Sequence, residues 1–106
     1  GVKATPLLRA ALTGDAAREA VVANVVFAPG ATTGRHSHPG DEYATVLEGE
    51  LELRIDGQPP RRVRAGEAYH NARGVIHETL NVGSVPARAA STFIIDKNAA
   101  LVIPAP

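Results

Sequence analysis

The stretch GATTGRHSHPGDEYATVLEG, residues 30–49, contains the most informative pattern in the chain. His36 and His38 are two residues apart, so both side chains face the same way on an extended strand. Glu42 follows after Pro39-Gly40, a turn-forming pair that can bring the next strand back alongside the first. The stretch therefore predicts two neighbouring strands with three potential metal ligands close together.

A second stretch, GEAYHNARGVIHETLN, residues 66–81, supplies a further histidine, His77. Three imidazoles and one carboxylate form a donor set that suits Fe, Mn, Co, Ni, Cu or Zn better than Ca or Mg. With four protein ligands, an octahedral ion keeps two open positions, whereas a tetrahedral structural zinc site is closed. These residues predict one divalent transition-metal ion bound by His36, His38, Glu42 and His77.

Further strands are predicted on both sides of these stretches. LELRI, residues 51–55, alternates apolar and charged side chains, which is typical of a half-buried strand. Asp56-Gly57 then predicts a hairpin turn toward a strand around Val63. Two more extended segments follow at residues 75–80 and 87–96. Short strands at such close intervals indicate an all-β sandwich or barrel.

The two ends of the chain show weaker patterns. Residues 1–19 are mixed, and DAAREA within them predicts one helical turn capped by Asp15. The β-branched residues that follow predict a strand over 21–28, which ends at a Pro-Gly pair. The apolar tail LVIP, residues 101–104, is expected to pack on the domain or on a second subunit.

Length and composition predict one domain covering residues 1–106, of which 44% are hydrophobic. The chain has no cysteine, which excludes disulfides and thiolate metal sites. Eleven basic and eleven acidic residues balance, so nothing supports binding to nucleic acid or to an anionic membrane. The one basic run, RRVR at residues 61–64, is interpreted as a solvated strand. No apolar run approaches the roughly 18 residues of a membrane span.

The two stretches together match a known pair of motifs. The first motif is Gly, five residues, His-x-His, three or four residues, Glu, six residues and Gly. The second is Gly, five residues, Pro-x-Gly, two residues, His, three residues and Asn. The chain fills nine fixed positions of these motifs: Gly30, His36, His38, Glu42, Gly49, Gly66, Gly74, His77 and Asn81. The chain thus resembles the cupin superfamily, in particular small single-domain bacterial cupins of the cupin 2 type.

This resemblance implies a jelly-roll β-barrel that holds a metal ion inside, near one open end. It implies the same four ligands, His36, His38, Glu42 and His77. The chain departs from the second motif at Ala72, where the family usually has Pro. That departure affects the stiffness of a turn and leaves the ligands in place.

Other polar and aromatic residues near the motifs are given structural roles. On a strand, Tyr43 points away from the metal, and Tyr69 lines either the cavity or the core. We interpret His70 as a hydrogen-bonded strand residue, in preference to a fifth ligand or a proton shuttle. Asn81 is expected at a turn or strand end. Two arginines flank the ligand-bearing segments, and we interpret them as solvated rim charges in preference to contacts for an anionic substrate: Arg35 and Arg73.

The fold does not determine the function. The favoured hypothesis is a metal-dependent enzyme, dioxygenase-like or isomerase-like, that acts on a small oxygenated substrate. The alternatives are a non-catalytic module that binds a small ligand through the metal, and a metal that only stabilises the fold. The residues assign no catalytic group beyond the metal ligands.

Assembly and location are further expectations. The apolar tail and the N-terminal segment VKATPLL can each extend a partner's sheet, so we expect a homodimer. The segments VKATPLL and HPGDEYATVLEGELELRIDGQP are similar to those of bacterial cupins made with an export signal. A periplasmic or secreted location is therefore favoured over a cytoplasmic one.

Overall fold

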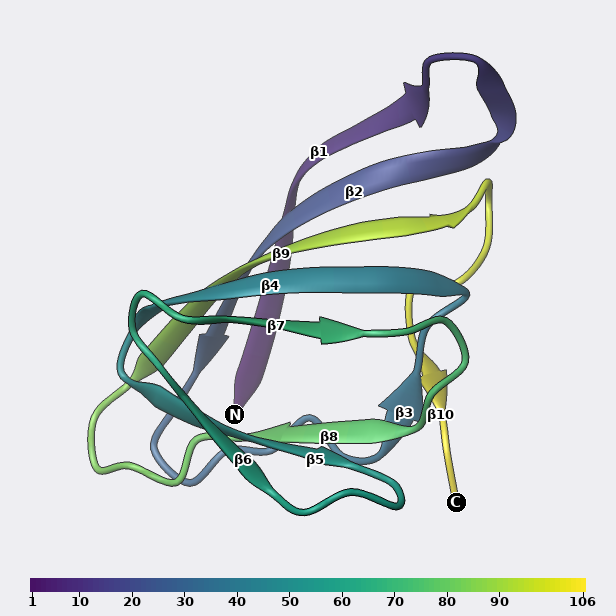
Figure 1. Cartoon of the computed structure of the whole chain (residues 1–106). Coiled ribbons are helices and arrows are strands. Elements are labelled where there is room, and N and C mark those ends of the chain that lie inside the picture. The colour runs from purple at the N-terminus through teal and green to yellow at the C-terminus, as the bar shows by residue number, and fades with distance from the viewer.

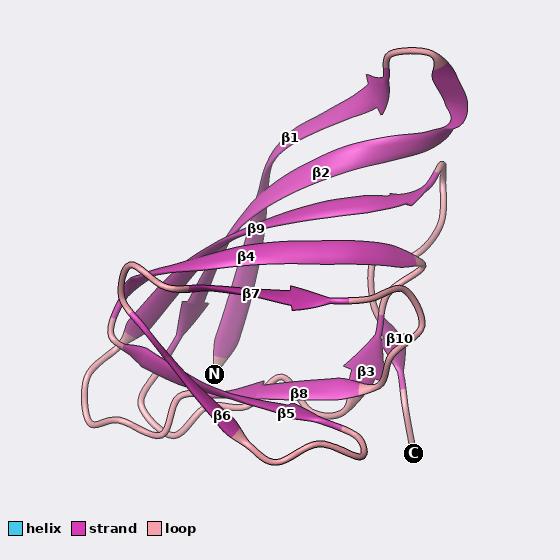
Figure 2. Cartoon of the chain, viewed as in Figure 1, coloured by secondary structure: helices cyan, strands magenta, loops and turns pink.

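The computed structural model describes residues 1–106 and consists of strands joined by turns and loops, with no helix (Figures 1 and 2). The ten strands are β1 Val2–Leu12, β2 Asp15–Phe27, β3 His36–Ser37, β4 Gly40–Glu48, β5 Glu50–Ile55, β6 Arg61–Arg64, β7 Ala68–Asn71, β8 His77–Leu80, β9 Ala87–Asp96 and β10 Ile103–Pro104. The structure contains no helix long and apolar enough to cross a membrane.

The strands form two antiparallel five-stranded sheets, with the orders β1-β2-β9-β4-β7 and β10-β3-β8-β5-β6. Figure 1 shows the first sheet above the second, with the N-terminus between them. This is the predicted all-β architecture of facing sheets. The expected jelly-roll β-barrel is corrected in one respect: the two sheets are not closed into a barrel, because the edge strands β1, β7, β10 and β6 do not pair with strands of the other sheet.

Alternation along the long strands decides which side chains face the space between the sheets. On β9, every second residue from Ala87 to Ile95 is buried, and the intervening ones are half-buried. On β4 the buried positions alternate in the same way between Gly40 and Val46. Buried apolar residues from both sheets form one hydrophobic cluster of 14 residues, and we call seven of its members the closed core: Ala44, Val46, Leu51, Leu53, Val63, Ala87 and Ala89.

The prediction for the first nineteen residues was wrong. Residues 2–12 form the edge strand β1, and DAAREA is the start of β2, where a helical turn was expected. The Asp15 carboxylate accepts a hydrogen bond from the Ala17 N–H at 3.0 Å, but it does so at a β-turn. Pairing with β1, and from Arg18 onward with β9 as well, outweighs the local helix preference of these residues.

The remaining strand predictions agree with the structure, except that Val75 and Ile76 of the predicted strand 75–80 precede β8. Residues 51–55 lie in β5, residues 87–96 form β9, and the tail pairs through Ile103 and Pro104 with β3. Gly40 permits β4 to run close against β9, because a Cβ atom there would lie 1.7 Å from the Ile94 carbonyl oxygen. This close approach fixes the start of β4 two residues before Glu42.

Candidate metal centre

The four predicted ligands come from three strands and one connecting segment. His36 lies in β3 and pairs directly with His77 of β8. His38 follows β3, and Glu42 lies in β4 of the opposite sheet. All four side chains are buried, with at most 6% of each residue exposed. The predicted residues therefore meet in the space between the two sheets.

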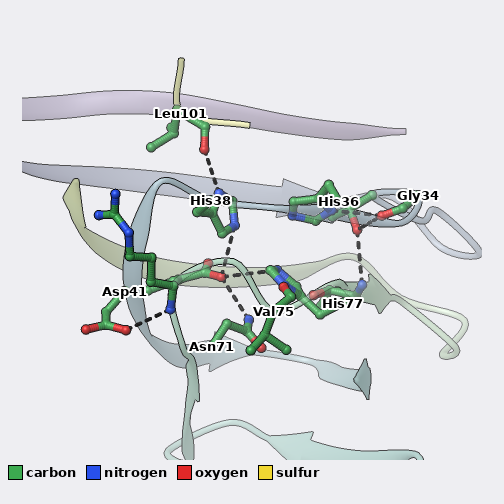
Figure 3. A network of polar contacts seen from close by, with 12 residues as sticks. Gly34, His36, His38, Asp41, Asn71, Val75, His77 and Leu101 are labelled. Atoms are coloured by element: carbon green, nitrogen blue, oxygen red, sulfur yellow. Dashed lines mark hydrogen bonds and ion pairs between the residues drawn. The ribbon is translucent and has the colours of Figure 1, made fainter. Parts of the chain in front are cut away.

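The ligand atoms are close enough to share one ion. One ring nitrogen from each of the three histidines could serve as a metal ligand, and these three atoms all lie within 4.8 Å of one another. Glu42 Oε1 lies 3.4 Å from His38 Nε2 and 3.6 Å from His77 Nε2. Figure 3 shows interactions of His38, His77 and Asn71 converging on one point, which is this carboxylate oxygen.

Backbone carbonyls fix the orientation of each imidazole (Figure 3). The Nδ1 atom of each histidine lies within hydrogen-bond distance of a carbonyl oxygen: His36 with Gly34 at 2.8 Å, His38 with Leu101 at 2.6 Å, and His77 with Val75 at 3.1 Å. A carbonyl oxygen can only accept, so each Nδ1 carries the proton and donates it. In a neutral ring, Nε2 then has the free lone pair that a metal ion needs.

The space around Glu42 is unfavourable without a cation. The Nε2 atoms of His38 and His77 are buried and have no hydrogen-bond partner. A neutral Nε2 with its lone pair and a carboxylate oxygen are both acceptors, so they repel one another at 3.4–3.6 Å. A metal ion between these atoms would satisfy all of them. The residues present therefore fit a bound divalent ion.

The surroundings of His36, His77 and Glu42 shift their pKa values in the direction that metal binding requires. Burial lowers the pKa of His77 to about 4 and also lowers the pKa of His36. Burial alone would raise the pKa of Glu42, but the nearby His38 and the Asn71 amide outweigh it, so that pKa is lowered. Near neutral pH, His36 and His77 are neutral and Glu42 is a carboxylate.

A cavity of about 320 Å³ lies beside these ligands and includes them in its wall. Its other polar wall residues carry hydroxyl groups: Thr32, Thr33, Tyr69, Thr79 and Ser91. The apolar part of the wall includes Val2, Val25, Phe27, Phe93, Leu101 and Val102. The Phe93 ring contacts His38 edge-on, at a centroid distance of 4.8 Å. The volume is at the lower end of the range for small-molecule sites.

Asn71 is the functional residue that sequence reasoning missed. It lies opposite Glu42 in the β4–β7 ladder and is only 1% exposed. Its Nδ2 donates to Glu42 Oε1 at 2.9 Å, so it holds the carboxylate in place. Strand alternation could have indicated it, because Asn71 is two residues from Tyr69 and both face inward.

The structure also places the residues that had been given structural roles. Tyr43 and His70 stack on the outer face, with centroids 4.7 Å apart, and the His70 ring also lies near the Asp41 carboxylate. Asn81 is buried at the end of β8 and donates to the carbonyls of Phe27 and Val85. Tyr69 lines the cavity, and burial together with the Glu42 charge raises its pKa.

The two arginines beside the ligands do not line the cavity. Arg35 donates to the Asp56 carboxylate and to the Pro106 carbonyl. Arg73 forms a two-point ion pair with Asp96 and donates to the Pro39 carbonyl at 2.9 Å. Both are rim charges with surface partners, as predicted.

Comparison with known proteins gives a consistent result. The Cupin domain family matches residues 23–95 of the chain. The transcriptional regulator PuuR of Escherichia coli is 40% identical over 73 residues, which cover 63% of this chain and 39% of PuuR. Oxalate oxidase GF-2.8 of Triticum aestivum is 39% identical over 77 residues, covering 65% of this chain and 34% of the oxidase.

A solved structure of an oxalate oxidase superposes with a TM-score of 0.70 and 33% identity, covering 80% of this chain and 45% of that one. The chain spans less than half the length of the curated relatives it matches. The family match covers most of the chain and includes all four predicted ligands. The chain therefore belongs to the cupin family.

Proposed function

We propose that this protein is a metal-dependent enzyme that acts on a small oxygenated substrate, with one divalent transition-metal ion held by His36, His38, Glu42 and His77. The observation that supports this most is the set of unpaired acceptors. Two buried imidazole nitrogens, which have no hydrogen-bond partner, lie 3.4 and 3.6 Å from one carboxylate oxygen, and a cation between these acceptors would satisfy all three. The adjoining cavity gives a substrate room beside the ion.

The residues of the chain prepare the site for such chemistry. A divalent ion bound there supplies Lewis-acid or redox chemistry at coordination positions that the protein leaves open. The carbonyls of Gly34, Val75 and Leu101 orient the imidazoles, and Asn71 orients the carboxylate. The apolar wall around Phe27 and Phe93 limits the number of water molecules near the reacting groups.

The similarity to oxalate oxidases supports enzymatic activity, because those relatives carry an oxidase name and share the cupin fold. The open cavity argues against a metal that only stabilises the fold, since a purely structural ion has no use for a neighbouring 320 Å³ space. The proposal does not choose among Fe, Mn, Ni, Cu and Zn as the bound metal.

The alternative function is a module that binds a small molecule through the metal without chemistry. The specific observation in its favour is the similarity to PuuR, which is named as a transcriptional regulator. A ligand retained through purification, with no turnover by the metal-loaded protein, would favour this alternative.

The test measures metal content by inductively coupled plasma mass spectrometry, on protein purified without an affinity metal column. The parent is expected to hold close to one equivalent of metal, and a His36→Ala/His38→Ala double variant to hold none. A Tyr43→Ala variant is the control, because Tyr43 lies on the outer face. Metal-loaded protein is then assayed for oxygen uptake and for turnover of phenols, diketones and keto acids. A parent that takes up no metal, or that turns over nothing when loaded, contradicts the enzyme proposal.

We also propose that the protein is a homodimer. The edge strand β1 supports this, because its outer backbone edge is unpaired and its Leu7 and Leu8 side chains are 67% and 57% exposed. Size-exclusion chromatography with light scattering tests it, and a strictly monomeric protein would contradict it. Location in the periplasm or outside the cell stays a proposal from the sequence, to be tested by cell fractionation.

A further inference from the structure

The charges around the cavity restrict what it can bind. No lysine or arginine is among its wall residues, and the two arginines that flank the ligand-bearing segments, Arg35 and Arg73, are paired with surface carboxylates. The only anionic group in the wall is Glu42. A divalent ion with three neutral histidines and the Glu42 carboxylate has a net charge of +1. One negative charge on the ligand makes the buried site neutral, whereas two leave an uncompensated anion, which is costly in a partly apolar cavity.

The other wall residues of the cavity indicate what the uncharged part of the ligand is like. Two of the threonine hydroxyls are already engaged: Thr32 donates to Glu78 at 2.7 Å, and Thr33 donates to the Gly34 carbonyl and accepts from the Thr79 N–H. The surface left for the ligand body comes mainly from apolar side chains, including Val25, Phe27 and Phe93. The cavity of about 320 Å³ has room for a small organic molecule beside the ion.

We propose that the ligand of this site is a small monoanion with an apolar body, whose single charged oxygen group meets the metal. This inference rests on the proposed metal site. It separates the chain from dicarboxylate chemistry, because a second carboxylate would have to enter a wall that has no cation. The ligand class thus includes monocarboxylates, phenolates and enolates with hydrocarbon bodies.

The test is isothermal titration calorimetry at pH 7.5 on zinc-loaded protein, which reports binding without turnover. Three ligands of equal non-hydrogen atom number are compared: hexanoate, the dianion succinate and the neutral hexanamide. Hexanoate is expected to bind at least about tenfold more tightly than either of the others. Hexanoate binding that is no tighter than succinate binding, including no detectable binding of either, would overturn the inference.

A charge-gain variant sharpens this test. Val102 lines the cavity yet is 48% exposed, so Val102→Arg places a cation at the cavity wall with little risk to folding. This variant is expected to reduce the preference for hexanoate over succinate at least about fivefold. The matched control Val85→Arg, at a 58% exposed position outside the cavity, is expected to keep the parent preference. An unchanged preference in Val102→Arg would count against the inference.

The outcomes separate this inference from the proposed function, because metal content is measured in the same samples. A protein that takes up no metal contradicts both. Metal-loaded protein that prefers succinate contradicts only the monoanion inference. Metal-loaded protein that prefers hexanoate but turns over no monoanionic substrate keeps the inference and favours the non-catalytic binding module.

Discussion

The closed core and the metal cavity are built from the same strands, yet they differ in chemistry. On β4, Glu42 faces the cavity and Val46 faces the closed core, and both are buried. On β9, Phe93 and Ser91 line the cavity, whereas Ala89 and Ala87 belong to the closed core. Alternation decides that all these side chains point inward. Position along the strand then decides whether a side chain contributes to packing or to the site.

This difference indicates that different residues stabilise the fold and form the site. The closed core removes apolar surface from water, which stabilises the folded state by about 25 cal/mol per Å². The cavity instead contains polar atoms without hydrogen-bond partners, which cost free energy in the metal-free protein. Substitutions in the two regions should therefore affect different measurements.

The largest effect is expected from loss of a ligand. His77→Ala should weaken metal binding at least about 1,000-fold, or about 4 kcal/mol, because a residue that binds the metal directly contributes more than the 10–100-fold typical of the residues that support it. Metal affinity is measured by competition with a chelator. His70→Ala, on the outer face, is the control and should bind like the parent. Equal affinities for the parent and His77→Ala would remove His77 from the ligand set.

Truncation of a side chain in the closed core should lower stability and leave metal affinity nearly unchanged. Leu51 is fully buried, so Leu51→Ala should lower the free energy of unfolding by about 3 kcal/mol in urea titrations. The folded variant should keep the parent's metal affinity within about twofold, because Leu51 does not line the cavity. Leu47→Ala, at a 42% exposed position on β4, should change stability by less than about 0.5 kcal/mol. Comparable destabilisation by both leucine variants would contradict the assignment of the closed core.

A pH titration of the metal-free protein distinguishes the two regions again. The pKa of His77 is about 4 when folded, because of burial, against 6.5 for a free histidine. Between these values the unfolded chain binds a proton that the folded chain does not, so lowering the pH favours unfolding. Stability should fall by about 2 kcal/mol from pH 7 to pH 4. The free energy of unfolding of Leu51→Ala, from urea titrations, should change with pH as steeply as that of the parent, and that of His77→Ala should change less steeply. Equal pH dependences in the two variants would show that His77 is not responsible.

The smallest effect is expected at Asn71, which supports Glu42 without being a ligand. Asn71→Leu removes the amide that donates to Glu42, so metal affinity should fall about tenfold. Metal-free stability should change by less than about 1 kcal/mol, since loss of the hydrogen bond to Glu42 is offset by removal of the buried, unpaired Asn71 Oδ1. The neighbouring substitution His70→Leu, which points outward, should leave metal affinity unchanged. A larger loss of stability than of affinity would make Asn71 a packing residue only.

Local sequence patterns were enough to predict a hairpin and the set of ligands. Period-two alternation in residues 51–55 and the turn at Asp56-Gly57 predicted a hairpin correctly, because the pattern and the turn are local. The spacing of His36, His38, Glu42 and His77 predicted one site, and the structure brings these side chains together. Motif spacing can do this because it reflects which residues face the same side of paired strands.

Other features of the fold and the site could be identified only from the tertiary structure. Residues 15–20 favour a helical turn locally, but pairing with β1 and β9 makes them a strand, and no local pattern contains that information. Asn71 gained its role by lying opposite Glu42 in the β4–β7 ladder, and the Leu101 carbonyl gained its role by meeting His38 across 63 residues of chain. Both depend on contacts between distant segments. The tautomers, the unpaired nitrogens and the wall without a cation follow from that packing, because the sequence fixes which groups are present and the fold fixes which of them meet.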